Sequence, residues 1–209
     1  MGRISTVEKQ KRNKNRVNVY IDGEYGGSLG VETVVKHRIR EGREISPDEL
    51  TAVFTEDNGK YAFDIAIKYI AYRARTKKQV VEHLEKKGIT PAAVENTIEK
   101  LTDYGYIDDR TYAEDFVRQA VSSGKYGKQN IRYKLRKKGI ADEVIDCALV
   151  FFTDRMEREQ AERLYDKLDR KYAGEPEQKK SQKIYRSMVR KGFPYDVAAA
   201  LVRQKGNDG

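Results

Sequence analysis

The sequence contains little cysteine and little histidine. Cys147 is the single cysteine among 209 residues, and His37 and His83 are the two histidines. A single cysteine cannot form a disulfide within the chain, which favours a reducing, cytosolic compartment. We expect Cys147 to be a buried small hydrophobic residue on the apolar side of a helix. Neither histidine has a cysteine or a second histidine at ligand spacing, so the sequence predicts no metal centre.

Long apolar runs are also missing. The longest one covers only residues 147–152, whereas a transmembrane helix needs about 20 predominantly apolar residues. The first ten residues contain no apolar signal core, and no phosphate-cradling glycine loop of the Walker type occurs. We therefore expect a cytoplasmic, monomeric protein that uses no cofactor, no small-molecule substrate and no membrane.

Charge is what the sequence has in excess. Lys and Arg total 42 against 33 Asp and Glu, which gives a formal net charge of +9. Apolar residues make up only 38% of the chain, and this argues against a single deep core. Thin helical units that each pack on a neighbour need less apolar material. The positive balance favours a polyanion, or the acidic surface of a protein, as partner.

One helical pattern occurs three times, in residues 76–101, 127–149 and 181–202. Each copy has apolar residues eight and four positions before a glycine, with a lysine directly before that glycine. The glycines are Gly88, Gly139 and Gly192. Their spacing of roughly fifty residues is typical of a repeat array. We expect each glycine to end a helix in the left-handed conformation, with a second helix following it.

A further helix is predicted before each of these pairs, since apolar residues recur there at helical spacing. The fold is therefore predicted to be mainly α, with three tandem three-helix repeats in an elongated, curved array. The expected boundaries are residues 58–108, 109–154 and 155–205 for the repeats, after an N-terminal β-rich module at 1–55.

The N-terminal module is predicted from alternation and turn signals. Residues 17–21, V-N-V-Y-I, show the alternation of a strand and are rich in β-branched and aromatic side chains. Asp22-Gly23 then signals a hairpin. Residues 25–29 can form the returning strand, and residues 4–9 a third one. A short helix is expected at 31–37. A capping box at Ser46, with proline at the first helical position, predicts a helix toward Phe54.

Several helix starts in the repeats carry capping signals. Thr76 and Gln79 form a capping box, and Thr90 is followed by Pro91. Asp108 or Asp109 can cap the next helix. A nuclease could use the acidic cluster there to bind Mg²⁺, but acids also favour helix starts, and we prefer the capping interpretation. The members of this cluster are Asp103, Asp108, Asp109, Glu114 and Asp115.

Basic residues gather in the second repeat, where residues 116–141 contain no acid. Lys128, Arg132 and Arg136 lie four apart and form one stripe, while Ile131 and Leu135 face elsewhere. The basic loop 122–127 can reach a phosphate or carboxylate. Such a stripe suits salt-dependent phosphate contacts, with a plain solvated face as the alternative. The candidate binding residues, including a smaller patch in the first repeat, are Arg73, Arg75, Lys77, Lys78, Arg118, Lys125, Lys128, Arg132, Arg136, Lys137 and Lys138.

Two other functions remain open. The helix–glycine–helix pattern also suggests a helix-turn-helix DNA reader, or more broadly a protein that binds DNA or RNA directly. We give this less weight because three copies of a generic helical hairpin are better explained by packing. A nuclease that uses the acidic cluster is the weaker alternative.

Several motifs, taken together, resemble those of the RecX family of recombination regulators. Residues 69–76, Y-I-A-Y-R-A-R-T, and 84–88, L-E-K-K-G, are similar to the first repeat of that family. G-Y-I-D-D at 105–109, followed by Tyr112-Ala113 and Phe116-Val117-Arg118, resembles the central signature. V-N-V-Y-I-D-G-E-Y is similar to the leader of longer members. One departure is Lys128-Gln129-Asn130, where the family tends to have arginines.

The resemblance implies a non-enzymatic regulator of the RecA recombinase. Members of the family are tandem three-helix repeats that bind in the groove of the RecA–single-stranded DNA filament. They limit filament growth or promote disassembly, which restrains strand exchange, ATP hydrolysis and the co-protease activity behind the SOS response. RecA and, through the filament, single-stranded DNA are thus the expected partners.

Overall fold

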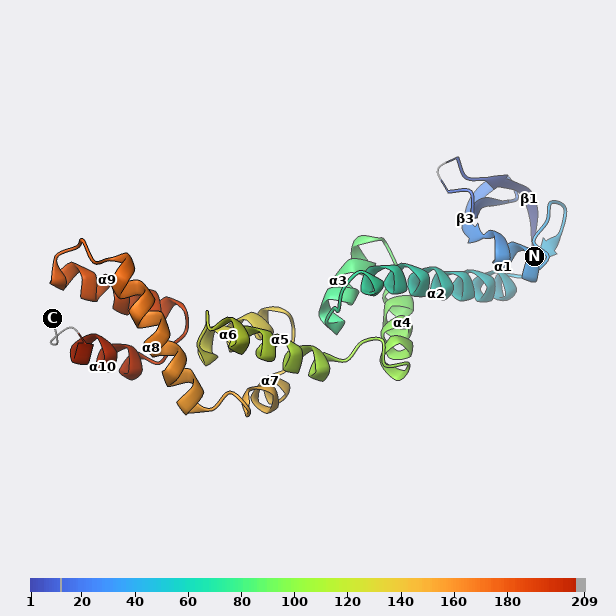
Figure 1. Cartoon of the computed structure of the whole chain (residues 1–209). Helices are drawn as coiled ribbons and strands as arrows, with labels where there is room; N and C mark the ends of the chain where they lie inside the picture. Colours follow the sequence, from blue (N-terminus) through green and yellow to red (C-terminus); the bar gives the residue numbers. More distant parts are fainter. Residues whose placement is uncertain (12, 206–209) are drawn as a thin grey trace. The chain divides into compact units, whose positions relative to one another are not determined.

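The computed structural model describes residues 1–11 and 13–205. Within them it has ten helices and a small four-stranded sheet, which confirms the predicted fold class (Figure 1). The chain divides into two compact units. Unit 1 contains Met1–Ala74 and Val80–Ile107, and unit 2 contains Arg75–Gln79 and Asp108–Gly209. No helix in the described ranges is long and apolar enough to cross a membrane.

The N-terminal sheet has the strand order β3-β2-β1-β4. Its strands are β1 (Gly2–Lys9), β2 (Arg16–Ile21), β3 (Glu24–Gly30) and β4 (Glu44–Ile45). The β2–β3 hairpin turns at Asp22-Gly23, and both residues have positive φ, 51° and 87°. The predicted hairpin and third strand are therefore confirmed, while the short β4 was not predicted.

Two helices that the sequence placed on either side of residues 55–58 are a single helix. After α1 (Val31–Lys36), α2 runs without interruption as Pro47–Ala71. Its start is the predicted one, because the Ser46 hydroxyl accepts a hydrogen bond from the Glu49 N–H at 3.1 Å. A glycine such as Gly59 destabilises a helix interior by about 1 kcal/mol relative to alanine. Burial of residues on both sides of it, such as Val53 and Ala62, stabilises the continuous helix.

A buried ion pair fastens the sheet to α2 inside unit 1. Arg16 and Asp57 are 8% and 2% exposed, and their charged groups lie 2.9 Å apart. The second oxygen of Asp57 accepts the Gly30 N–H at 2.7 Å, and Arg16 also donates to the Ser28 carbonyl at 2.7 Å. Both charges are thus paired and hydrogen-bonded, as burial of ions requires.

The remaining helices complete three three-helix repeats, the first of which uses α2. They are α3 (Lys77–Lys86) and α4 (Pro91–Asp103), then α5 (Asp109–Ser123), α6 (Lys128–Lys137) and α7 (Asp142–Leu149), then α8 (Asp154–Lys171), α9 (Glu177–Arg190) and α10 (Tyr195–Lys205). Gly88, Gly139 and Gly192 have φ of 75°, 85° and 82°, which confirms the left-handed turns.

Each repeat has a core of its own, built on the apolar positions that precede the turn glycine. Those side chains are at most 1% exposed: Val80, Leu84, Ile131, Leu135, Ile184 and Met188. The expectation for Cys147 was wrong, because its side chain is exposed. The inward positions of the short α7 are Ile145, Ala148 and Leu149, and at helical spacing Cys147 points away from that stripe.

Unit 2 contains a joint in which the start of one helix is held by the following repeat. Thr76 and Gln79 form the predicted capping box, at 3.2 and 3.3 Å. The Thr76 hydroxyl also donates to the Lys138 carbonyl at 2.8 Å, at the Lys-Gly turn of the second repeat. The Lys77 N–H donates to the Asp109 carboxylate at 2.9 Å. The Thr76 hydroxyl and the Lys77 N–H at this helix start thus both have hydrogen-bond partners in the second repeat.

The same joint recurs between the second and third repeats. The Gly127 N–H donates to the Lys191 carbonyl at 3.0 Å, and the Lys128 N–H donates to Glu157 at 2.7 Å. The backbones approach closely there, because a Cβ at Gly127 would lie 2.3 Å from the Gly192 oxygen. Only glycine fits this contact, so the repeats are linked by backbone packing at a fixed place.

Candidate nucleic-acid interface

The predicted basic stripe is a row on the exposed side of α6. Lys128, Arg132 and Arg136 have side chains that are 27%, 32% and 55% exposed. Ile131 and Leu135, from the opposite side of the helix, are fully buried. We call these three cations the α6 row. The geometry on which the prediction depended is therefore present.

Each member of the α6 row is paired with a carboxylate of the same chain. Arg136 donates twice to Asp142, at 2.6 and 3.0 Å, and Arg132 pairs with Asp146. The hydrogen bond from Arg136 lowers the pKa of the Asp142 carboxyl. These aspartates belong to α7, the helix that follows the turn, so the hairpin itself supplies the acids.

The first member of the row is paired as well. The Lys128 ammonium lies 2.5 Å from Asp154, in the first turn of α8, and lowers the pKa of that carboxyl. Its backbone N–H is held by Glu157, whose pKa is raised by burial. The α6 row is thus a cationic surface already neutralised by its own chain.

A sequence signal for this pairing exists but was missed. Arg136 lies three residues before Gly139 and Asp142 three after it, and Arg132 and Asp146 lie seven before and seven after. In a helical hairpin, positions at equal distance from the turn come side by side.

The other predicted cations have varied surroundings. Arg118 pairs with Glu114 and Asp115 on its own helix, at 3.2 and 3.3 Å. The Lys138 ammonium lies 5.6 Å from the centre of the Tyr112 ring. Lys77 is half-buried at the first joint. Arg75 and Lys78 belong to unit 2, as the α6 row does, whereas Arg73 belongs to unit 1.

Lys125 and Lys137 are the predicted cations of unit 2 that remain exposed and uncompensated. Neither takes part in an ion pair with any residue that the structure describes. Lys125 stands in the loop between α5 and α6, next to Gly124, whose φ is 61°. This loop leads to a second basic surface.

A hollow of about 610 Å³ in unit 2 brings together five cations that come from three segments of the chain. Those cations are Lys125, Arg163, Lys167, Lys171 and Lys191. Arg163, Lys167 and Lys171 lie four apart on α8, and we call them the α8 row. No acidic side chain of the described residues lines the hollow. Sequence reasoning missed this row, although R-x-x-x-K-x-x-x-K is visible at 163–171.

The acidic cluster serves helix starts and ion pairs. Asp108 is the N-cap of α5 and accepts from the Arg110 N–H at 2.9 Å, which confirms the capping interpretation there. Asp109 caps the start of α3 instead, and burial raises its pKa. Within residues 1–11 and 13–205, no group of three or more His, Cys, Asp or Glu side chains is placed to hold a metal ion.

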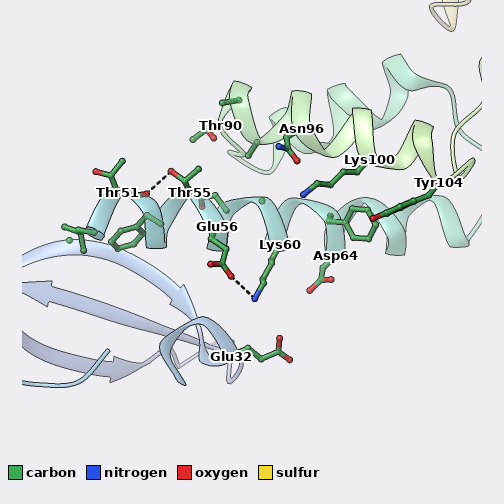
Figure 2. Close-up of a pocket in the computed structure, with 18 residues that line it drawn as sticks. Glu32, Thr51, Thr55, Glu56, Lys60, Asp64, Thr90, Asn96, Lys100 and Tyr104 are labelled. Carbon is green, nitrogen blue, oxygen red and sulfur yellow. Dashed lines mark hydrogen bonds and ion pairs between the residues drawn. The ribbon is translucent and has the colours of Figure 1, made fainter. Parts of the chain in front are cut away.

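A larger hollow, of about 970 Å³, belongs to unit 1. Figure 2 shows Glu56 and Lys60 of α2, Lys100 of α4 and Tyr104, which follows α4, among the residues that line it. Lys36, His37 and Lys60 lower the pKa of Glu56 to about 2. Acids (Glu32, Glu56 and Asp64) and bases (Lys60 and Lys100) both line this hollow, so it offers no uniform field for a polyanion.

The fold and the candidate site define a class: a helical-repeat protein with an N-terminal β module and cationic surfaces on its repeats. Comparison with known families gives four matches in chain order. They are the regulatory protein RecX N-terminal domain at 2–46, and the first, second and third three-helix domains of RecX at 62–101, 108–149 and 156–202.

Whole-chain relatives give the same result. Regulatory protein RecX of Limosilactobacillus reuteri is 34% identical over 94% of this chain and 74% of its own length. That of Bacillus licheniformis is 32% identical over 96% and 76%. A crystal structure of regulatory protein RecX superposes with a TM-score of 0.70 at 32% identity, covering 96% of this chain and 98% of that one. RecX from Lactobacillus salivarius gives 0.64 over 71% and 97%. This chain belongs to the RecX family of regulatory proteins.

Proposed function

We propose that this protein regulates the RecA recombinase by binding the RecA–single-stranded DNA filament. It modulates, and mostly inhibits, strand exchange, ATP hydrolysis and co-protease activity, and so regulates DNA repair and the SOS response in the cytoplasm. The observation that carries the proposal is the full set of four RecX domains in chain order. The cationic surfaces of unit 2 support it, because a DNA-containing filament is a polyanion.

The proposed action is binding without chemistry. The repeats have separate small cores, and inside unit 2 the carbonyls of Lys138 and Lys191 hold the helix starts at Thr76 and Gly127. Such arrays present extended binding surfaces. The acids that a nuclease would need are occupied in caps and ion pairs at Asp108, Asp109 and Glu114. We therefore propose a monomeric regulator that is not an enzyme.

The eleven predicted cations remain the proposed contact residues. Their surroundings indicate which of them should contribute more to binding and which less. Uncompensated residues such as Lys125 and Lys137 are available to an incoming anion at once. The α6 row must first exchange Asp142, Asp146 and Asp154 for that anion, which reduces the gain from each contact. We therefore expect the α6 row to contribute less than its charge alone indicates.

The first experiment is a pull-down of RecA with this protein, with and without single-stranded DNA and ATP. We expect retention that depends on DNA and ATP, together with slower DNA-dependent ATP hydrolysis by RecA. Unchanged hydrolysis at every stoichiometry would refute the proposal.

Direct DNA or RNA binding without RecA is the second candidate, favoured by the uncompensated α8 row. Tight, sequence-selective binding with a steep salt slope in the absence of RecA would favour it.

A further inference from the structure

The hollow of unit 2 gathers positive charge from segments that are far apart in sequence. Arg163, Lys167 and Lys171 come from α8, Lys125 from the α5–α6 loop and Lys191 from the turn after α9. Along the whole described chain, none of the five takes part in an ion pair. The α8 row extends over about 12 Å, since a helix rises 1.5 Å per residue.

This arrangement is unfavourable for the helix that carries it. Like charges four residues apart on a helix repel each other, whereas opposite charges attract. Lys167 has only Arg163 and Lys171 at the positions four residues away. No ion pair in the described part of the protein engages the α8 row, whereas aspartates pair with each member of the α6 row. The Lys171 ammonium lies 5.2 Å from the centre of the Tyr172 ring, and Lys167 has no such contact among the described residues. An external anion would compensate the repulsion within the α8 row.

The floor and rim of the hollow add other features. Gln160 is 8% exposed and donates through Nε2 to the Val121 carbonyl at 2.7 Å. Its Oε1 is buried and has no hydrogen-bond partner among the described residues. At the rim, the charges of Lys191 and Lys125 add to the hydrogen bond from Lys134 in lowering the pKa of Tyr126. The site thus combines positive charge with an acceptor that lacks a donor.

We propose that this hollow is a binding site for single-stranded nucleic acid, with the α8 row, Lys125 and Lys191 contacting consecutive phosphates. A nucleic-acid strand presents its charges in a line, as the α8 row does. Its bases carry hydrogen-bond donors, which suit the unpartnered Gln160 oxygen. In a duplex the bases stay stacked inside, whereas a single strand can turn them into a hollow. The inference rests on the proposed function for its biological role, because it assigns the surface that meets the DNA strand.

The test compares two variants of the full chain that lose the same charge. R163Q/K167Q/K171Q neutralises the α8 row, and K128Q/R132Q/R136Q neutralises the α6 row. The probe is a short fluorescein-labelled oligo-dT, and its binding is followed by anisotropy over a salt series without RecA. We expect the first variant to bind about tenfold more weakly, with the salt slope lowered by about 2. The α6-row variant should also lose affinity, but by less than roughly threefold, because its cations reach an anion only after leaving Asp142, Asp146 and Asp154.

Competitors decide which anion the hollow takes. Unlabelled oligo-dT should displace the probe better than poly-glutamate or duplex DNA at equal charge. Equal displacement by poly-glutamate would assign the hollow to an acidic protein surface and overturn the proposal, as would equal displacement by duplex. Equal losses in the two variants, or unchanged binding in the α8-row variant with its circular dichroism intact, would also overturn it. Inhibition of RecA by the wild-type protein, measured separately, would in each case leave the proposed function standing.

Discussion

The α6 row and the α8 row have the same spacing and opposite electrostatic surroundings. Arg132 and Arg136 face Asp146 and Asp142 across a helical hairpin, and Lys128 faces Asp154. Lys167 faces a hollow lined by further cations. The number of positive residues in a sequence segment therefore does not predict the electrostatic potential at the surface that the segment forms. What distinguishes the two rows is the segment that folds against each of them.

The two rows should also contribute differently to the stability of the fold and to the binding of an anion. Ion pairs at the surface contribute little to stability, so the α6 row is at most mildly stabilising. The α8 row has no such compensation in residues 13–205 and carries repulsion along its helix. Uncompensated charge of this kind is typical of binding sites that trade some stability for function.

The largest effect is expected at the turn that the two rows share. Lys191 lines the hollow of the α8 row, while its carbonyl and Gly192 hold the start of α6. Gly192→Ala would place a Cβ 2.3 Å from the Asn130 nitrogen, at a φ of 82°. We expect it to lower the free energy of unfolding by about 2–4 kcal/mol, measured by urea denaturation. Gly174→Ala, with no atom within 4 Å of the new Cβ, is the control and should cost far less.

Removing the acids should convert the α6 row into an uncompensated one. For D142N/D146N/D154N we expect about tenfold tighter binding of oligo-dT, with a salt slope steeper by about 2. Anisotropy over a salt series measures both. The control D48N/E95Q/E99Q makes the same charge change at exposed residues of unit 1. An equal gain in that control would mean that net charge, rather than the α6 row, sets the affinity.

Neutralising the rows should affect stability in different ways. K128Q/R132Q/R136Q should unfold at a slightly lower temperature than the wild type, because three exposed pairs are broken. R163Q/K167Q/K171Q should stay within about 0.5 kcal/mol of the wild type, since relief of repulsion offsets the favourable position of Lys171 at a helix end. Thermal unfolding in low salt measures this difference, which high salt should diminish. A destabilised α8-row variant would contradict the interpretation of that row.

The smallest effect concerns pH at the joint that begins the α6 row. Burial raises the pKa of Glu157, so the folded state holds that proton more tightly than the unfolded state does. Stability from Glu157 is therefore greatest below the ordinary glutamate pKa, and declines as pH rises through the raised value. Relative to Glu157→Gln, the wild type should lose stability between pH 4 and pH 7. Chemical denaturation at a series of pH values checks this trend, and a gain with rising pH would contradict it.

The sequence predicted the elements whose signals are local. The Lys-Gly turns, the capping box at Thr76 and the β2–β3 hairpin depend on residues within a few positions of each other. Cys147 was misjudged because α7 is short and its inward stripe shifts by one position. The continuity of α2 through Gly59 was missed because local propensity was weighed without the burial on both sides.

The candidate site was predicted less well because it depends on contacts between helices. The basic residues of α6 were found, but not their partners, which lie up to 26 residues away in the case of Lys128 and Asp154. The hollow combines Lys125, the α8 row and Lys191, and only tertiary packing brings these segments together. A count of charged residues along the sequence leaves out the opposite charges that folding places beside them.

The most direct test measures inhibition of DNA-dependent ATP hydrolysis by RecA with the wild type and both row variants. Our account predicts inhibition by the wild type, a concentration for half-inhibition about tenfold higher for R163Q/K167Q/K171Q, and a value within roughly threefold of the wild type for K128Q/R132Q/R136Q. Unchanged inhibition by the α8-row variant, with the α6-row variant inactive, would contradict it.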